Sequence, residues 1–166
     1  MNVFTSTFAT PIGPFSVAVN ETGAVVATAF GKVAALKSRL PECHFTTDGQ
    51  RTQIARQQIE EYFAGTRQKF DLKLAPIGTD FQNMVWAALR RIPFGKTESY
   101  GNLAERIHRP TAARAVGRAN ATNPICLIVP CHRVIGADGS LTGFAFGEKI
   151  KQALLEHEGS SRARAM

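Results

Sequence analysis

The spacing of apolar residues changes around Pro76-Ile77-Gly78 from the period of a strand to that of a helix, and this change limits the possible folds most strongly. Before it, apolar and polar residues alternate in short runs separated by turn residues. We therefore predict an α/β protein with a strand-rich N-terminal α/β domain at residues 1–75 and a helical C-terminal domain at residues 79–159. The polar residues 160–166 are predicted to form a disordered tail.

The first domain contains several short apolar runs that are bounded by Gly, Pro, Asn and Asp residues. Period-two alternation predicts strands, whereas apolar residues at helical spacing predict helices, the longer of which Gly65 would end. The predicted elements are strands at residues 3–9, 15–19 and 24–30, a short helix at 32–40, a longer helix around 55–63 and a strand at 70–74.

Helix-start and helix-stop signals divide the second domain. Thr79 and Gln82 have the spacing of a capping box, and Thr111 is the expected cap of a later helix. Two short helices, at residues 100–107 and 112–119, are predicted to form a helix-turn-helix, winged-helix-like unit of the kind that binds DNA. A final helix is expected to end at Gly159, where the glycine suits a left-handed cap.

The basic residues are concentrated in one segment of a chain whose net charge is +7. Residues 80–118 contain seven Lys and Arg against three Asp and Glu, which predicts a surface that faces phosphates. We expect Arg106, Arg109 and Arg118 to contact the phosphates, so DNA binding should weaken steeply with salt.

Three cysteines, an odd number without paired spacing, argue against a disulfide framework and favour a reducing, cytoplasmic location. The chain has no apolar run long enough to cross a bilayer and no signal-peptide pattern at its start, so no membrane association is expected. Zinc needs about four closely placed ligands, whereas Cys43-His44 offers one adjacent Cys-His pair and the other histidines lie far from it, so no metal site is assigned.

The sequence Pro130-Cys131-His132-Arg133 places a thiol beside an imidazole and a guanidinium. It follows an apolar run at residues 125–129, which we expect to be a buried extended segment. Neighbouring positive charge or a base converts a thiol into a nucleophilic thiolate. Taken alone, the pattern fits equally well a buried cysteine that is followed by two polar surface residues.

The whole segment of residues 79–159 resembles the O6-alkylguanine-DNA alkyltransferases, a family of suicide DNA-repair proteins. The blocks that carry the resemblance are Phe81-Gln82 with Val85-Trp86, Ile92–Gly95, Ser99–Gly101, Ala112–Gly117, Ala119-Asn120, Asn123-Pro124, Val129–Gly136, and Leu154-Leu155 with His157–Gly159. The resemblance implies direct reversal of damage, with irreversible, single-turnover transfer of the alkyl group from O6-alkylguanine in double-stranded DNA to Cys131. It implies a monomer that uses no cofactor.

The resemblance also implies four catalytic residues. Glu158 would orient His132, which would activate Cys131 as the nucleophile. Tyr100 would donate a proton to the departing guanine. Without the resemblance, Glu158 reads as an ordinary solvated residue in the last turn of a helix.

For DNA binding, the resemblance implies a minor-groove helix whose Arg114 takes the place of the flipped base. The small residues Ala112, Ala113 and Gly117 would keep this helix narrow enough for the groove, and Arg118 would lie on the same face. The alternative interpretation is an alanine-rich helix packed in a core.

Around the base, Pro130 would form a pocket wall, Ala145 would offer its backbone amide to O6, and Asn123 would brace the cysteine loop. Two residues depart from the family pattern: Phe144 stands where the family usually has Tyr, and Phe146 stands where it usually has Gly. Phe144 keeps an aromatic wall without the hydroxyl, whereas Phe146 changes the shape of the substrate loop.

Two alternatives stay open on the sequence alone. The first is a non-catalytic alkyltransferase-like sensor, which would bind the lesion without removing the alkyl group; the presence of Cys131 argues against it. The second is a cysteine hydrolase or thiol redox enzyme, which would turn over and would have no use for Arg114 on a small-residue helix.

Overall fold

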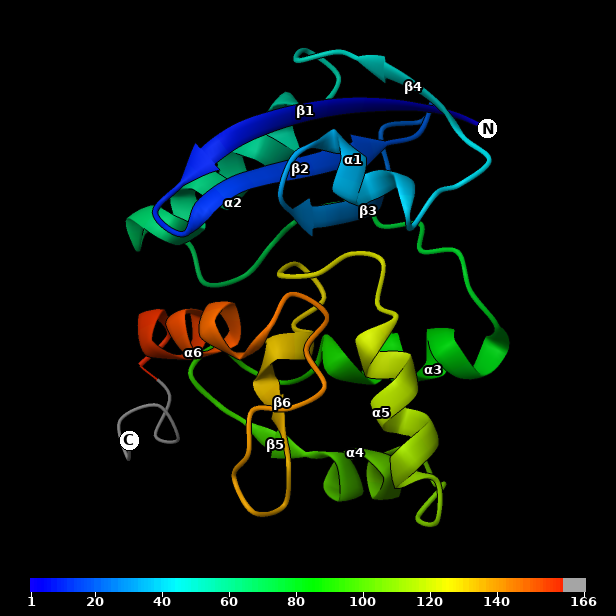
Figure 1. Cartoon of the computed structure of the whole chain (residues 1–166), viewed down its shortest axis with the longest axis vertical. Coiled ribbons are helices and arrows are strands. Elements are labelled where there is room, and N and C mark those ends of the chain that lie inside the picture. Colours follow the sequence, from blue (N-terminus) through cyan, green and yellow to red (C-terminus); the bar gives the residue numbers. More distant parts are fainter. Residues whose placement is uncertain (160–166) are drawn as a thin grey trace. The chain divides into compact units, whose positions relative to one another are not determined.

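The computed structural model describes residues 1–159, and its residues divide into two compact units, 1–77 and 78–166 (Figure 1). The disordered tail predicted at residues 160–166 lies outside the described part. No helix within residues 1–159 is long and apolar enough to cross a membrane. The first unit is built on a sheet, and the second consists mainly of helices (Figure 1).

The first unit contains a four-stranded sheet with the strand order β3-β2-β1-β4. Strand β1 pairs antiparallel with β2 and parallel with β4, and β2 pairs antiparallel with β3. The strands β2 and β3 are largely buried, and Phe15, Val17 and Ala27 have no exposed surface. The elements are β1 (Asn2–Thr10), β2 (Gly13–Val19), β3 (Val25–Phe30), α1 (Val33–Lys37), β4 (His44–Thr47) and α2 (Gln53–Ala64).

Most of these elements confirm the sequence prediction, but the strand expected at residues 70–74 is wrong. Leu74 forms only an isolated bridge with Val25. The side chain of Gln58 in α2 takes the place of a partner strand, because its Oε1 accepts from Asp71 N at 2.8 Å and its Nε2 donates to Asp71 O at 3.0 Å. The strand that the sequence did not indicate, β4, is short and largely exposed, so it lacks a clear apolar alternation.

The second unit packs α5 against both α3 and α4, and a short parallel pair of strands, β5 and β6, lies beside them (Figure 1). This pair matters for the site, because α4 begins directly after β5 and β6 directly follows the turn that carries Cys131. The elements are α3 (Asp80–Leu89), β5 (Glu98–Ser99), α4 (Tyr100–Arg106), α5 (Ala113–Ala121), the 3₁₀ turn η1 (Cys131–Arg133), β6 (Val134–Ile135) and α6 (Glu148–His157).

The helix starts show which sequence signals were reliable. The capping box is confirmed, because Thr79 Oγ1 accepts from Gln82 N at 3.1 Å and Gln82 Oε1 accepts from Thr79 N at 2.8 Å. The cap expected at Thr111 is wrong, since α5 begins after Ala112 without a side-chain cap. The turn before it depends instead on His108, which has a positive φ of 61°.

The apolar run before Cys131 is buried, as predicted, but it is not extended. Leu127 has a φ of 73°, and the chain folds back so that Val129 N donates to Ile125 O at 2.9 Å. Asn123 holds this turn with its side chain, whose Nδ2 donates to Val129 O at 2.9 Å and whose Oδ1 accepts from Ile125 N at 3.0 Å. The Asn123 side chain thus gives these two backbone groups the hydrogen-bond partners that a neighbouring strand would otherwise provide.

Candidate active site

Cys131 is placed by a tight turn at Pro130. Pro130 has φ −81° and ψ 64°, the conformation of an inverse γ-turn, and Cys131 N donates to Val129 O at 2.8 Å. The 3₁₀ turn that follows is closed by Arg133 N, which donates to Pro130 O at 3.0 Å. Cys131 keeps only 4% of its surface exposed, so the thiol lies in a nearly water-free environment.

His132, the next residue, contacts Glu158 at the end of α6. The distance between His132 Nε2 and Glu158 Oε2 is 2.8 Å, and neither side chain has any exposed surface. The other ring nitrogen, His132 Nδ1, is buried without a hydrogen-bond partner among residues 1–159. The structure thus brings together the imidazole and the carboxylate that the sequence separates by 25 intervening residues.

Arg133 makes a two-pronged ion pair with the same carboxylate. Arg133 Nε donates to Glu158 Oε1 at 2.8 Å, and its Nη2 donates to Oε2 at 2.9 Å. The remaining Nη1 donates to Ile92 O at 2.7 Å. Arg133 was expected only to add positive charge beside the thiol; its guanidinium is directed to Glu158 and fixes the carboxylate that holds His132.

The charges of this buried group follow from its contacts. Burial by itself raises the pKa of Glu158, but the hydrogen bonds from His132 and Arg133, with the positive charge of Arg133, outweigh it and hold that pKa well below its usual range. Burial lowers the pKa of His132, and Glu158 offsets only part of this effect. Since Arg133 stays charged, Glu158 remains ionised beside a neutral His132. His132 Nε2 then donates to Glu158, and Nδ1 keeps a lone pair that can accept a proton.

Tyr100 begins α4, and its side chain reaches the loop after β6. Its Oη donates to Thr142 O at 2.9 Å. Burial raises the pKa of Tyr100, as does negative charge at Cys131, and a hydrogen bond from Asn120 partly offsets these effects. Tyr100 therefore keeps its proton at neutral pH, and its interaction with Cys131 places it in the same site.

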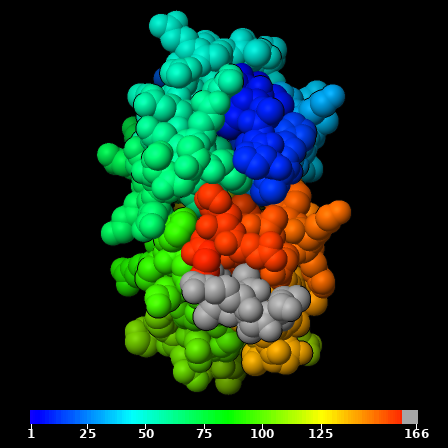
Figure 2. Space-filling view, turned by 90° about the vertical axis from the view of Figure 1, so that its left-hand side faces the viewer, coloured from blue at the N-terminus to red at the C-terminus, as the bar shows by residue number. Residues whose placement is uncertain are grey.

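Lys151 is a buried cation of this site that the sequence analysis missed. It has no exposed surface, although it belongs to α6, whose outer side lies at the surface of its unit (Figure 2). Its Nζ donates to Val134 O and to Thr142 O. Burial lowers its pKa to about 8, opposed by negative charge at Cys131. A sequence signal was present, because Lys151 occupies the buried stripe of the helix with Leu154 and Leu155.

The predicted pocket residues lie in the loop between β6 and α6. Phe144 is buried, and its ring packs against that of Phe146 with centroids 5.8 Å apart. Ala145 is exposed at the tip of the turn, which Gly147 N closes by donating to Phe144 O at 3.1 Å. The bulky Phe146 thus packs along the Phe144 ring.

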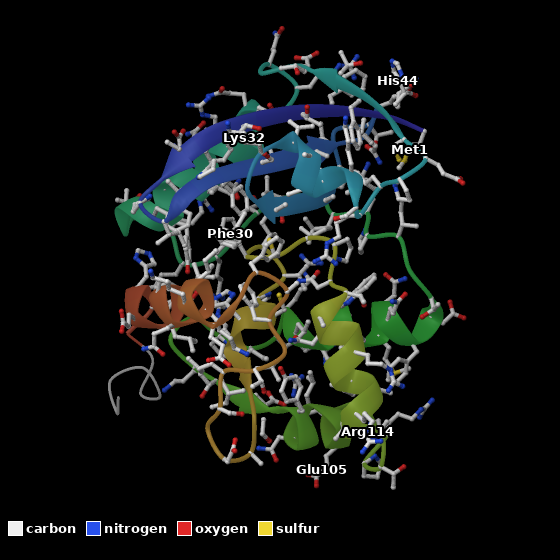
Figure 3. All side chains as sticks on the ribbon, in the orientation of Figure 1. Met1, Phe30, Lys32, His44, Glu105 and Arg114 are labelled. Atoms are coloured by element: carbon white, nitrogen blue, oxygen red, sulfur yellow. The ribbon has the colours of Figure 1, made fainter. Side chains whose placement is uncertain are left out.

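Helix α5 has two different faces. Val116, Ala119 and Asn120 are buried, whereas Arg114 and Arg118 are exposed. Figure 3 shows Arg114 near the start of α5, at the periphery of the unit. The small residues expected beside these arginines are half-buried: they are Ala112, Ala113 and Gly117. The alternative interpretation required a helix that is enclosed in a core. Helix α5 is not enclosed, because one of its faces is exposed.

Arg106, one of the three arginines expected to contact phosphate, also makes contacts within its own unit. Arg106 Nε donates to Glu98 Oε1 at 2.8 Å, and its Nη2 donates to Ala88 O at 3.0 Å. All three arginines of the predicted trio are exposed, so the contact of each with phosphate stays a prediction. Within the described chain, no three His, Cys, Asp or Glu side chains gather as a metal site.

Two protein-family models match almost the whole chain. Residues 3–76 match the 6-O-methylguanine DNA methyltransferase, ribonuclease-like domain, and residues 80–160 match the DNA binding domain of the same name. A methylated-DNA–protein-cysteine methyltransferase of Methanosarcina acetivorans is 49% identical over 154 residues, which are 92% of this chain and 96% of the relative. The Shigella flexneri protein of the same name is 43% identical over 91% of this chain and 92% of its own length.

Solved structures lead to the same family. The crystal structure of Mycobacterium tuberculosis O6-methylguanine methyltransferase is 45% identical, with a TM-score of 0.83 over 95% of this chain and 93% of that chain. The complex of M. tuberculosis OGT with DNA has a TM-score of 0.84 at 44% identity, over 98% of this chain and 94% of that chain. The family and the fold class that the motifs predicted are thereby confirmed. The chain belongs to the methylated-DNA–protein-cysteine methyltransferases, which repair DNA by alkyl transfer.

Proposed function

We propose that Cys131 accepts the alkyl group of O6-alkylguanine in double-stranded DNA, irreversibly and once per molecule. The observation that carries this proposal is the buried contact of 2.8 Å between Glu158 Oε2 and Nε2 of His132, the residue that follows Cys131. It leaves His132 Nδ1, the only basic atom of the ring, without a partner among the described residues. A hydrolase or redox enzyme would also need such a base, but the exposed arginines of α5 favour DNA as the partner.

The transfer is a direct displacement. His132 Nδ1 takes the thiol proton, and Cys131 Sγ attacks the alkyl carbon on O6. The new S–C bond forms as the C–O6 bond breaks, and the bonding electron pair stays on guanine. Tyr100, which keeps its proton, supplies it to N3 of the departing base. Since the product is a thioether without a good leaving group, the protein cannot return to its starting state.

The alkylated base is stacked inside the duplex, so it must be flipped out to reach Cys131. We assign this step to α5 in the minor groove. Arg114 would fill the gap, Arg118 would contact phosphate, and Ala112, Ala113 and Gly117 would allow close approach. The two faces of α5 support this assignment, because its arginines are exposed while its opposite side is buried.

The proposal extends to the domains, the oligomeric state and the cellular location of the protein. Residues 1–75 and 79–159 would be two domains, and the second contains every residue that is assigned to the reaction. The protein would act as a monomer, because no step needs a residue from a second copy. Three cysteines that carry thiols fit a reducing, cytoplasmic location.

The proposal is tested by mixing the protein with a duplex that contains O6-methylguanine and counting transferred methyl groups. We expect transfer to stop at one methyl group per protein molecule, whatever the excess of DNA. Binding of the methylated duplex without transfer would support a sensor instead. Continued turnover would support a hydrolase or a redox enzyme.

Adding one methyl group at Gly143 should disable the site through Tyr100. Gly143 has a φ of +85°, and a Cβ there would lie 2.4 Å from Tyr100 Oη. The Tyr100 side chain must move in Gly143→Ala, and a displacement of about 1 Å costs roughly a hundredfold in rate. The measurement is the single-turnover rate of methyl transfer at saturating DNA.

Gly147→Ala is the matched control. Gly147 lies in the same loop with a φ of +94°, but a Cβ there meets nothing within 4 Å. Both variants carry the backbone strain of a non-glycine residue at positive φ, about 1–3 kcal/mol, and Gly147, whose ψ is 159°, lies in a region that is essentially restricted to glycine, so the control is at least as strained. Only Gly143→Ala should lose activity; equal rates in the two variants would remove Tyr100 from the mechanism.

Removing one phosphate contact should make DNA binding less sensitive to salt. In Arg118→Ala, the slope of log K against log salt concentration should become shallower by about 1, because one fewer counterion is released. Titrations of duplex DNA at several salt concentrations measure this slope. Lys32→Ala removes the same charge from an exposed position in the first unit and should leave the slope unchanged. Equal slopes in all three proteins would exclude Arg118 from the DNA interface.

A further inference from the structure

The carbonyl oxygen of Ala119, in the last turn of α5, is held by a side chain from another helix. Trp86 of α3 is 2% exposed, and its Nε1 donates to Ala119 O at 2.8 Å. The backbone group that usually donates to such a carbonyl, Asn123 N, donates to Asn120 O at 3.3 Å instead. The indole of Trp86 therefore takes the place of a backbone hydrogen bond at the C-terminal end of α5.

A second contact from α3 reaches the same end of α5. Gln82 Nε2 donates to Thr122 Oγ1 at 3.2 Å, while its Oε1 belongs to the capping box of α3. The Thr122 hydroxyl has one hydrogen, which lies within reach of Arg118 O at 3.1 Å and of Ala119 O at 3.2 Å. The indole also has one hydrogen, and Trp86 directs it to Ala119 O. Trp86 thus makes the stronger of the two attachments.

Helix α5 offers little apolar surface of its own for packing. Its buried residues are Val116, Ala119 and Asn120, of which only Val116 has a branched apolar side chain. Its N-terminal end has no side-chain cap. Since hydrophobic stabilisation follows the apolar area that is buried, small residues hold a helix weakly. The position of α5 within its unit therefore depends strongly on the hydrogen bonds at its C-terminal end.

Gly78 leaves the space that the indole ring occupies. A Cβ at this position would lie 2.4 Å from Cη2 and 2.6 Å from Cζ3 of Trp86. Both atoms belong to a rigid, buried ring, which cannot yield by rotating one end of a flexible chain. Any other residue at this position must displace the ring that holds Ala119 O.

Resting on the function proposed above, we propose that Trp86 is a positioning residue for base flipping. Through Ala119 O it fixes α5 in the position from which Arg114 displaces the alkylated base toward Cys131. Arg114 and Ala119 belong to the same nine-residue helix, so an attachment at one end also fixes the other. The helix contacts the cysteine turn as well, because Asn120 Nδ2 donates to Cys131 O at 3.3 Å.

This role concerns only a base that has to be flipped out of a duplex. The free base O6-methylguanine can reach Cys131 without any insertion of α5 into a groove. Loss of the Trp86 contact should therefore slow transfer from duplex DNA and leave transfer from the free base unchanged. A residue that merely stabilises the fold would affect both substrates alike.

Gly78→Ala tests the proposal with Trp86 itself intact. A displacement of about 1 Å costs roughly a hundredfold in rate, so single-turnover transfer at saturating O6-methylguanine duplex should fall by this factor. Affinity for the duplex and the rate with the free base, supplied at high concentration, should equal those of the parent. Trp86 is the only tryptophan of the chain, so its fluorescence emission reports whether the ring has moved.

Gly49→Ala is the matched control. Neither glycine has a positive φ, and a Cβ at Gly49 meets nothing within 4 Å. This variant should match the parent in emission, affinity and both rates.

Trp86→Phe removes the indole N–H but keeps an aromatic ring, and it serves if Gly78→Ala fails to fold. The duplex rate should fall roughly fivefold, the effect of one neutral hydrogen bond, with the free-base rate unchanged. Equal losses with both substrates would overturn the inference, as would a parent-like duplex rate in Trp86→Phe or in a Gly78→Ala variant whose emission has shifted. Absence of transfer from the duplex in the parent would instead contradict the proposed function.

Discussion

Replacing Cys131 with serine should abolish methyl transfer and leave DNA binding unchanged. Serine has nearly the same size, but its hydroxyl stays protonated where the thiol ionises, and it is the weaker nucleophile. Removal of a nucleophile from an enzyme that uses one costs roughly a million-fold in rate. Cys131 is 4% exposed, so the substitution alters little of the protein's surface. The measurements are the single-turnover rate with O6-methylguanine DNA and the affinity for the same duplex.

Cys126→Ser provides the control for this variant. Cys126 is 1% exposed and lies in the turn that precedes the site, so serine there introduces a hydroxyl into an apolar environment. We expect lower stability but transfer that still reaches completion. If the Cys131→Ser variant transferred methyl groups as fast as the parent, the nucleophile would have to be another residue.

Replacing Arg133 with methionine should cause the largest loss of stability. Arg133 is 6% exposed, and three of its guanidinium nitrogens donate to Glu158 or to Ile92 O. Without it, Glu158 remains buried with a charge that only His132 can balance. Breaking a buried pair by removal of one partner costs about 3–5 kcal/mol. The free energy of unfolding, measured by denaturant titration, should fall by this amount.

Arg67→Met tests whether this loss depends on burial. Arg67 pairs with Glu61 at 2.9 Å, nearly the same distance, but the two side chains are 28% and 34% exposed. An exposed pair contributes about 0–1 kcal/mol, because water screens it. Similar losses in the two variants would mean that the buried pair is not what holds Glu158 in place.

Local signals in the sequence predicted the structure correctly where one short segment contains all the interacting groups. Thr79 and Gln82 form the predicted capping box because both partners lie within one turn of helix. Prediction failed where a side chain from elsewhere replaced a backbone partner. The side chain of Gln58 pairs with the backbone of Asp71 in the expected strand, and Asn123 holds the turn that is found in place of the expected extended segment.

In the candidate site, too, local motifs were predicted correctly and contacts between distant residues were not. The motif around Cys131 identified the thiol and the imidazole, and the resemblance to the family implied Glu158. The spacing of residues alone gives no sign that Arg133 and His132 share one carboxylate. Asn120 is a buried polar residue in the otherwise apolar face of α5, and the sequence gives no sign that its side chain contacts Cys131 O.

The most direct test of the account is to locate the transferred methyl group by mass spectrometry of peptides. Trypsin cleaves after Arg118 and Arg133, so one peptide contains both Cys126 and Cys131. After reaction with O6-methylguanine DNA, this peptide should gain the mass of one methylene group, and fragment ions should place the gain on Cys131. A gain on Cys126, on the peptide that contains Cys43, or on no peptide would contradict the account.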